Sequence, residues 1–436
     1  MTETQSASES QGQTRLTGEL LIENMTAEER ERAQRVESVL PALREHALKV
    51  DQDAEFCRDH IPMLSKAGLM GLIIPKEYGG LGGGLRDLAA ATLAMGTACP
   101  STALAYFFHC SSASRGLLAR EALDAGLFNE QEAPLVRAFA EKVLNRMGRE
   151  GKWLANFGSE SVKNASAAVS IATEARKTEG GWLINGVKSF GCATGVADYY
   201  LVTAKLEGAD TAAGLVTFLV PRDAKGLKER AKWDAIGMRG TATHGLILED
   251  VFVADDEALT VESAFVRMMQ MSRGSFVGNQ LAGTAIYVGG AQTVYDSAIK
   301  QITETRFKDT GESVGMSPMH QELVGRMTVQ LETSYLWLRR QLELETSQPP
   351  LKSKGDVFKQ WRLAKGEIVE ACFEVAQGAL KCCGTGATGN TGVYARGLRD
   401  LSMGLVQAFP AERGRLEVAK LIISGQGQAL FGATKK

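Results

Sequence analysis

The stretch Gly181–Val202, GWLINGVKSFGCATGVADYYLV, decides which kind of fold this chain can form. Two runs that begin in it, Gly181–Asn185 and Tyr199–Ala204, are rich in the β-branched and aromatic residues that favour strands. Asn185-Gly186 predicts a hairpin turn after the first run, because both residues tolerate a positive φ. The stretch therefore predicts β-structure in the middle of the chain.

Three more runs of the same composition surround this stretch: Ala167–Thr173, Gly214–Val220 and Gly245–Val253. Turn residues such as Glu179-Gly180-Gly181 lie between the runs. Several short strands at this spacing are typical of a β-barrel or sandwich.

Both flanks of the β-region have helical patterns. Thr26-Ala27-Glu28-Glu29 has the sequence of a capping box, and apolar residues then recur every three or four positions. Helical patterns return near Val261, as in an antiparallel bundle. The predicted fold is a multidomain α+β protein with an all-α N-terminal domain, a β-barrel or sandwich middle domain and a C-terminal four-helix-type bundle. The predicted segments are a disordered tail at 1–25, the N-terminal helical domain at 26–152, the middle β-domain at 153–260 and the helical bundle domain at 261–436.

The composition excludes several classes of function. The net charge of −2 gives no electrostatic reason to bind nucleic acid or a membrane surface, and the apolar runs are too short to span a bilayer. The first 18 residues are polar and lack the apolar region of a signal peptide. Seven cysteines without metal-ligand spacing fit a reducing compartment, so we expect a cytoplasmic protein without a metal site.

Several motifs, in order along the chain, resemble those of the acyl-CoA dehydrogenase superfamily. They are LIIPKEYGGLGG at 72–83, the stretch at 181–202, AIGMRGTATHGLILEDVFV at 235–253, ETRF at 304–307, CGTGATG at 383–389 and RGLRD at 396–400. The resemblance covers roughly residues 26–432. It implies a flavin-dependent oxidoreductase that binds FAD between the β-domain and the C-terminal bundle, and a homotetramer built as a dimer of dimers.

The resemblance also implies which residues bind FAD. Phe190 and Cys192 would lie at the flavin ring, together with Asn156-Phe157-Gly158-Ser159, and Arg306 would bind the pyrophosphate. Backbone at Gly384 and Gly386 would approach the adenosine-diphosphate part from a neighbouring subunit. The cofactor-binding candidates are Asn156, Phe157, Gly158, Ser159, Phe190, Cys192, Arg306, Gly384 and Gly386. Departures from the family pattern, such as Phe307-Lys308-Asp309 after Arg306, leave open whether FAD binds tightly or a partner supplies reduced flavin.

The catalytic glutamate of this family is missing from both of its usual positions. One position, eight residues after the pair Arg399-Asp400, is Ala408; the other, just before Arg273, is Ser272. Glu412, after the helix break at Phe409-Pro410, is either a displaced base or a residue that stabilises the helix dipole. Arg273 would bind a carboxylate or phosphate, or form a salt bridge at the end of a helix.

His109 is the third catalytic candidate. It lies on a largely apolar helical run, where a core histidine with one hydrogen bond is the common case. The alternative is an acid/base residue or a hydrogen-bond donor beside the flavin.

The predicted function is FAD-dependent oxidation of an acyl-CoA or similar small molecule. The alternatives are a flavin-dependent monooxygenase of the same fold and a non-catalytic flavoprotein. An electron-transfer flavoprotein is the expected partner of a dehydrogenase, whereas a monooxygenase needs O2 and a flavin reductase.

Overall fold

The N-terminal part is helical, as predicted. The computed structural model describes residues 15–161, 171–273 and 276–424. Thr26 caps the first helix, because its Oγ1 accepts from Glu29 N at 3.2 Å while Glu29 Oε2 accepts from Thr26 N at 2.8 Å. The helices of this part are α1 (Ala27–Glu37), α2 (Leu40–Asp53), α3 (His60–Lys66), α4 (Leu85–Ala98), α5 (Pro100–Ser112), α6 (Ser114–Asp124) and α7 (Ala133–Gly148).

The predicted disordered tail is wrong for residues 15–25. Leu16, Leu21 and Ile22 are buried, and a short 3-10 helix spans Thr17–Leu20. These apolar side chains remove enough surface from water to hold the segment against the helices. Residues 1–14 lie outside the described part of the chain.

The middle part is one eight-stranded sheet. Its strands are β1 (Leu154–Phe157), β2 (Glu174–Thr178), β3 (Gly181–Lys188), β4 (Tyr199–Leu206), β5 (Leu215–Pro221), β6 (Leu227–Glu229), β7 (Leu246–Ala254) and β8 (Ala258–Leu259). The order is β6-β7-β3-β2-β4-β5-β8, with β1 paired parallel to β4. Of the predicted strand Ala167–Thr173, residues 167–170 lie outside the described residues, and the rest precedes β2.

The hairpin turn predicted at Asn185-Gly186 is wrong. Both residues lie inside β3, where the register against β7 shifts between Ile184 and Gly186. The turn of the hairpin is Glu179-Gly180, between β2 and β3, and Gly180 has a φ of +69°. Gly186 therefore marks a bulge in a strand rather than a turn.

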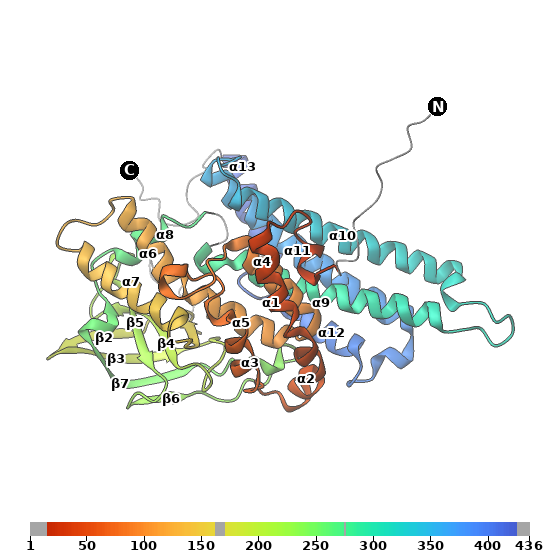
Figure 1. Cartoon of the computed structure of the whole chain (residues 1–436), viewed down its shortest axis with the longest axis horizontal. Coiled ribbons are helices and arrows are strands. Elements are labelled where there is room, and N and C mark those ends of the chain that lie inside the picture. The colour runs from red at the N-terminus through yellow and green to blue at the C-terminus, as the bar shows by residue number, and fades with distance from the viewer. Residues whose placement is uncertain (1–14, 162–170, 274–275, 425–436) are drawn as a thin grey trace.

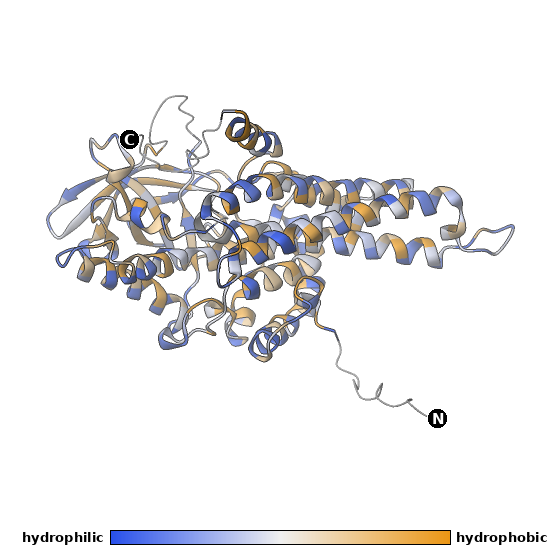
Figure 2. Cartoon of the chain, turned by 90° about the horizontal axis from the view of Figure 1, so that it is seen from above, coloured by the Kyte–Doolittle hydropathy of each residue, from blue (hydrophilic) through white to orange (hydrophobic). Residues whose placement is uncertain are grey.

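The C-terminal part is helical again. Its helices are α8 (Ala264–Met269), α9 (Phe276–Glu304), α10 (Pro318–Thr346), α11 (Lys354–Cys383), α12 (Val393–Ser402) and α13 (Ala411–Ser424). Helices α9, α10 and α11 extend away from the sheet (Figure 1), and hydrophobic and hydrophilic residues alternate along them (Figure 2). Gly289 lies inside α9. A Cβ there would lie 2.1 Å from Leu93 O, so this glycine lets α4 pack closely.

The predicted order of helical, β and helical parts is confirmed, whereas the domain boundaries stay predictions. Within the described ranges, no helix is long and apolar enough to cross a membrane.

Candidate functional site

The pair Arg399-Asp400 joins all three parts of the fold. Arg399 forms a bidentate ion pair with Asp51 of α2, at 2.7 and 2.5 Å. Asp400 Oδ1 accepts a hydrogen bond from Met238 N at 2.7 Å. Burial raises the pKa of this carboxyl to about 6, against the opposing effect of that hydrogen bond. A Cβ on Gly237 would lie only 2.1 Å from Arg399 O, which explains the glycine at this contact. The pair is a structural junction.

The predicted helix break follows this junction. Ala408 has a φ of +63°, and α13 begins at Ala411, directly after Pro410. The buried Lys365 ammonium on α11 donates to Gly404 O at 2.8 Å and to Phe409 O at 2.5 Å, so it fixes both sides of the break. Tyr287 OH on α9 donates to the Gln407 side chain. These bonds hold Ala408, the position of the missing glutamate, in a defined backbone conformation.

Glu412 points to solvent. Its side chain is 75% exposed, and its nearest cation is Arg415, at 3.6 Å on the same helix. This placement fits a glutamate that stabilises the N-terminus of α13.

We therefore expect Glu412→Gln to leave turnover within about twofold of the wild-type value, because an exposed i,i+3 ion pair contributes under about 1 kcal/mol. Steady-state kinetics of the two proteins, compared at one flavin concentration, test this. A loss of 100-fold or more would restore the displaced-base hypothesis.

His109 is a core histidine. It is fully buried on α5, its Nδ1 accepts from Leu154 N at 3.1 Å, and its Nε2 donates to Met70 O at 2.8 Å. Burial lowers the pKa of the imidazole to about 4. Both nitrogens are used by backbone groups, so the geometry favours a structural role over acid/base catalysis.

His109 should make the fold sensitive to acid. Its pKa in the folded state lies below the ordinary value near 6.5, so its contribution is complete above pH 6.5 and is lost as the pH falls toward 4. We expect the stability difference between wild type and His109→Gln to shrink by up to about 3 kcal/mol across this range. Urea denaturation at several pH values measures it. A difference that is constant with pH would contradict the assignment.

Two strained segments of the middle part lie together. Ala193 N donates to Thr241 O and Thr194 N donates to Ala242 O, both at 2.9 Å. The residues with a positive φ in these segments are Phe190 (+58°), Ala193 (+60°), Met238 (+51°) and Ala242 (+48°). Such conformations are unfavourable for residues with side chains and cluster at functional sites. Segments 190–195 and 238–243 are therefore the strongest candidates for a binding wall.

Phe190 presents an aromatic surface on this wall. Its side chain is 57% exposed, and its ring meets that of Trp233 edge-on at 6.3 Å. Cys192, in contrast, is buried and hydrogen-bonded to Thr243, and burial raises its pKa to about 12. Phe190 is available to a planar ligand, whereas the Cys192 thiol faces the interior.

The predicted segment Asn156-Phe157-Gly158-Ser159 divides in the same way. Phe157 is buried, and a Cβ on Gly191 would lie 2.1 Å from its ring, so Phe157 supports the wall from behind. Asn156 Oδ1 is buried and has no hydrogen-bond partner among the residues that the structure describes. An orphaned acceptor at this place fits a ligand that carries an N–H group, as the flavin ring does.

The remaining cofactor candidates lie elsewhere in the chain. Arg306 is exposed in the connection between α9 and α10, at the end of the bundle far from the strands (Figure 1). Gly384 ends α11 with a φ of +69°, and neither it nor Gly386 has an atom within 4 Å of a built Cβ. One chain does not bring this group together with Phe190.

Arg273 lines a hollow of about 300 Å³. The lining also includes Ser272, Glu121 on α6 and Lys354 at the start of α11. With the Gln348 amide oriented to present its oxygen, that oxygen accepts from both Arg273 Nη atoms at 2.8 and 2.9 Å. Burial raises the pKa of Glu121, against the opposing effect of Arg273. The sequence analysis missed Glu121 and Lys354, because no local signal separates them from other charged helix residues.

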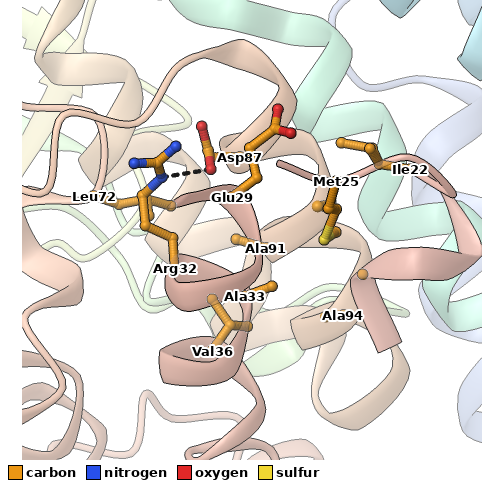
Figure 3. Close-up of a pocket in the computed structure, with 12 residues that line it drawn as sticks. Ile22, Met25, Glu29, Arg32, Ala33, Val36, Leu72, Asp87, Ala91 and Ala94 are labelled. Carbon is orange, nitrogen blue, oxygen red and sulfur yellow. Dashed lines mark hydrogen bonds and ion pairs between the residues drawn. The ribbon is translucent and has the colours of Figure 1, made fainter. Parts of the chain in front are cut away.

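A second cavity belongs to the packing of the N-terminal helices. It lies between α1 and α4, has a volume of about 10 Å³ and is bordered by the Arg32–Asp87 ion pair at 2.6 Å (Figure 3). This volume holds about one water molecule. It is too small for a substrate.

Comparison with known proteins identifies the family. The family models "Acyl-CoA dehydrogenase, N-terminal domain" and "Acyl-CoA dehydrogenase, middle domain" match residues 26–122 and 157–251. The chain belongs to the acyl-CoA dehydrogenase superfamily. The chain is 25% identical over 389 residues to the putative acyl-CoA dehydrogenase YdbM of Bacillus subtilis. The aligned residues cover 88% of this chain and 94% of YdbM.

Other similar proteins include a nitrososynthase and two structures with bound FMN. L-evernosamine nitrososynthase from a Micromonospora strain is 31% identical over 264 residues, covering 60% of this chain and 58% of that protein. The structure of KijD3 in complex with FMN and a dTDP-amino sugar superposes on this chain with a TM-score of 0.76 at 24% identity. The superposition covers 94% of this chain and 97% of KijD3. FMN-bound TdsC of a Paenibacillus strain has a TM-score of 0.76 at 21% identity, with 91% and 98% covered. The predicted fold and the expectation of a flavin-dependent oxidoreductase are confirmed.

Proposed function

We propose that this protein is a flavin-dependent monooxygenase that uses reduced flavin and O2. One observation carries the proposal: Ala408 occupies the position of the family's catalytic base, and the nearby Glu412 faces solvent. Acyl-CoA dehydrogenation requires a base that removes the α-proton of the thioester. Oxygen transfer from a reduced flavin places no such demand on this position.

The flavin would lie against segments 190–195 and 238–243. When bound and reduced, it delivers one atom of O2 to the substrate and the other to water. Phe190 would stack on the ring, and Asn156 Oδ1 would accept from its N–H edge. The strained backbone of the two segments holds these groups in place before the ligand binds. Nitrososynthases and the FMN-bound structures among the relatives support this reading.

The hollow at Arg273 is the proposed substrate site. Its lining combines a guanidinium, an ammonium and the exposed carboxyl of Glu121, so it suits a polar substrate with an anionic group better than a plain hydrocarbon. Gln348 holds Arg273 in a planar arrangement that a carboxylate or phosphate can also use.

A second candidate function rests on Glu121. This carboxyl has a raised pKa and lines the same hollow as Ser272, which is the other family position of the base. An acyl-CoA dehydrogenase could therefore use Glu121 for proton abstraction and pass its electrons to an electron-transfer flavoprotein. The expected substrates of that reaction are acyl-CoA thioesters.

Two assays on the purified protein separate these functions. A monooxygenase should purify nearly colourless and consume O2 only when a flavin reductase supplies reduced flavin. A dehydrogenase should purify yellow and be bleached by an acyl-CoA without O2, and Glu121→Gln should abolish the bleaching. Anaerobic bleaching that depends on Glu121 would overturn the monooxygenase proposal.

A further inference from the structure

Three side chains of the metal-binding type meet where α2 leads into α3. His46 lies on α2, Cys57 lies in the connection, and His60 is the first residue of α3. His46 Nδ1 is 3.1 Å from His60 Nε2 and 3.6 Å from Cys57 Sγ, and all three ligand atoms lie within 4.8 Å of one another. The sequence analysis missed this group, because the spacing of the three residues matches no common zinc motif.

Two of the three distances between ligand atoms fit a tetrahedral ion. Zinc binds imidazole nitrogen at about 2.0–2.1 Å and thiolate sulfur at about 2.3 Å, so tetrahedral ligand atoms lie about 3.3 Å apart for two nitrogens and about 3.6 Å apart for nitrogen and sulfur. The observed 3.1 and 3.6 Å are close to these values. To admit the ion, the two rings must separate slightly, and Cys57 Sγ, which lies within 4.8 Å of His60 Nε2, must come to about 3.6 Å from that nitrogen.

The surroundings prepare the site on its buried side and leave it open on the other. His60 Nδ1 lies 3.0 Å from Thr102 Oγ1, and if it donates there, its Nε2 lone pair faces His46 and Cys57. A second hydrogen bond of this kind commonly orients a metal-ligating histidine. His60 is fully buried, whereas His46 and Cys57 are partly exposed. The ion can therefore enter from solvent and keep a water as its fourth ligand.

We propose that His46, Cys57 and His60 bind one Zn²⁺ ion, which ties α2 to α3. The connection that carries Cys57 also docks on the middle part of the fold. Phe56 packs edge-on against Trp153 at 5.6 Å, and Arg58 donates to Gly195 O at 2.8 Å. An ion that ties α2 to α3 fixes this connection, and through Arg58 it supports segment 190–195.

Metal binding to the full-length protein tests this directly. The protein is stripped with a chelator under reducing conditions, dialysed against Zn²⁺ or Co²⁺, and assayed for metal and for the thiolate-to-cobalt charge-transfer band. We expect one ion per chain in the wild type, and at least a 100-fold weaker affinity with loss of the band in Cys57→Ser. His46→Gln should weaken binding similarly. Cys383→Ser, a partly exposed cysteine outside the group, is the matched control and should bind as the wild type does.

Two results would overturn the proposal. One is a folded wild-type protein that retains no stoichiometric Zn²⁺ or Co²⁺ at micromolar concentrations. The other is equal binding by the wild type and Cys57→Ser. The measurement on the wild-type protein can refute the site by itself, even if one of the variants does not fold.

Discussion

Replacing Lys188 by Met is expected to lower the free energy of unfolding of the middle sheet by about 3–5 kcal/mol. Lys188 ends β3 and pairs with Glu160 at 2.6 Å, and the two side chains are 0% and 2% exposed. Glu160 also accepts from Thr173 Oγ1 at 2.7 Å and from Ala172 N at 2.6 Å, and these bonds and Lys188 together hold its pKa below the usual value in spite of burial. Without the ammonium, a buried carboxylate loses the cation that pairs with it among the residues that the structure describes.

The matched control is Lys228→Met. Lys228 pairs with Glu249 at the same 2.6 Å, but these side chains are 62% and 60% exposed, so the expected loss is under about 1 kcal/mol. Urea denaturation followed by tryptophan fluorescence, to which Trp182 in β3 contributes, compares the two variants. Equal shifts of the midpoint would contradict the structural importance of the buried pair. Adding Glu160→Gln to Lys188→Met should recover part of the loss, because no lone charge is then buried.

The pair also bears on the candidate flavin wall. Ser189 N, next to Lys188, donates to Ser159 O at 2.9 Å, and Arg230 donates to Ser189 Oγ at 2.7 Å. Loss of the ion pair should therefore weaken flavin binding as well as stability.

The order of helical and β-regions could be predicted from the sequence, because each region follows local rules. The capping box at Thr26 starts α1 as expected, and Pro410 separates α12 from α13. The choice between turns could not be predicted in this way. Asn185-Gly186 and Glu179-Gly180 carry similar turn signals, and pairing of β3 with β7 across Asn185-Gly186 decides between them. Such pairing joins residues far apart in the sequence, so the local propensity of either segment does not predict it.

The candidate site was predictable only in part, for a related reason. The family position of the base lies eight residues after Asp400, so the sequence alone shows that Ala408 occupies it. The direction of a side chain is set by packing, and Phe157 and Cys192 turn inward although their neighbours Asn156 and Phe190 do not pack as core. Groups assembled from distant elements, such as Glu121 with Lys354, carry no signal in either segment.

The separation of Phe190 from Arg306 leads to the prediction with the largest effect on ligand binding. Helices α9 and α11 both end far from the strands, so Arg306 and Gly384 lie away from the proposed flavin ring (Figure 1). If the flavin is FAD, we propose that these residues of a second copy hold its adenosine-diphosphate part, in the expected dimer of dimers. FMN lacks that part and would bind to the proposed wall at Phe190 without the second copy.

Arg306→Ala should therefore weaken FAD binding by about 10- to 150-fold, because a charge-assisted hydrogen bond to phosphate contributes about 1.5–3 kcal/mol. The same variant should leave FMN binding unchanged. Phe190→Ala should weaken both flavins by about tenfold, since both stack through the same ring. Arg326→Ala is the matched control, because Arg326 is an exposed arginine on α10 whose only described ion pair is with Glu322. Titration of each flavin against fluorescence quenching measures the affinities, and an equal loss of FAD and FMN in Arg306→Ala would rule out the shared site.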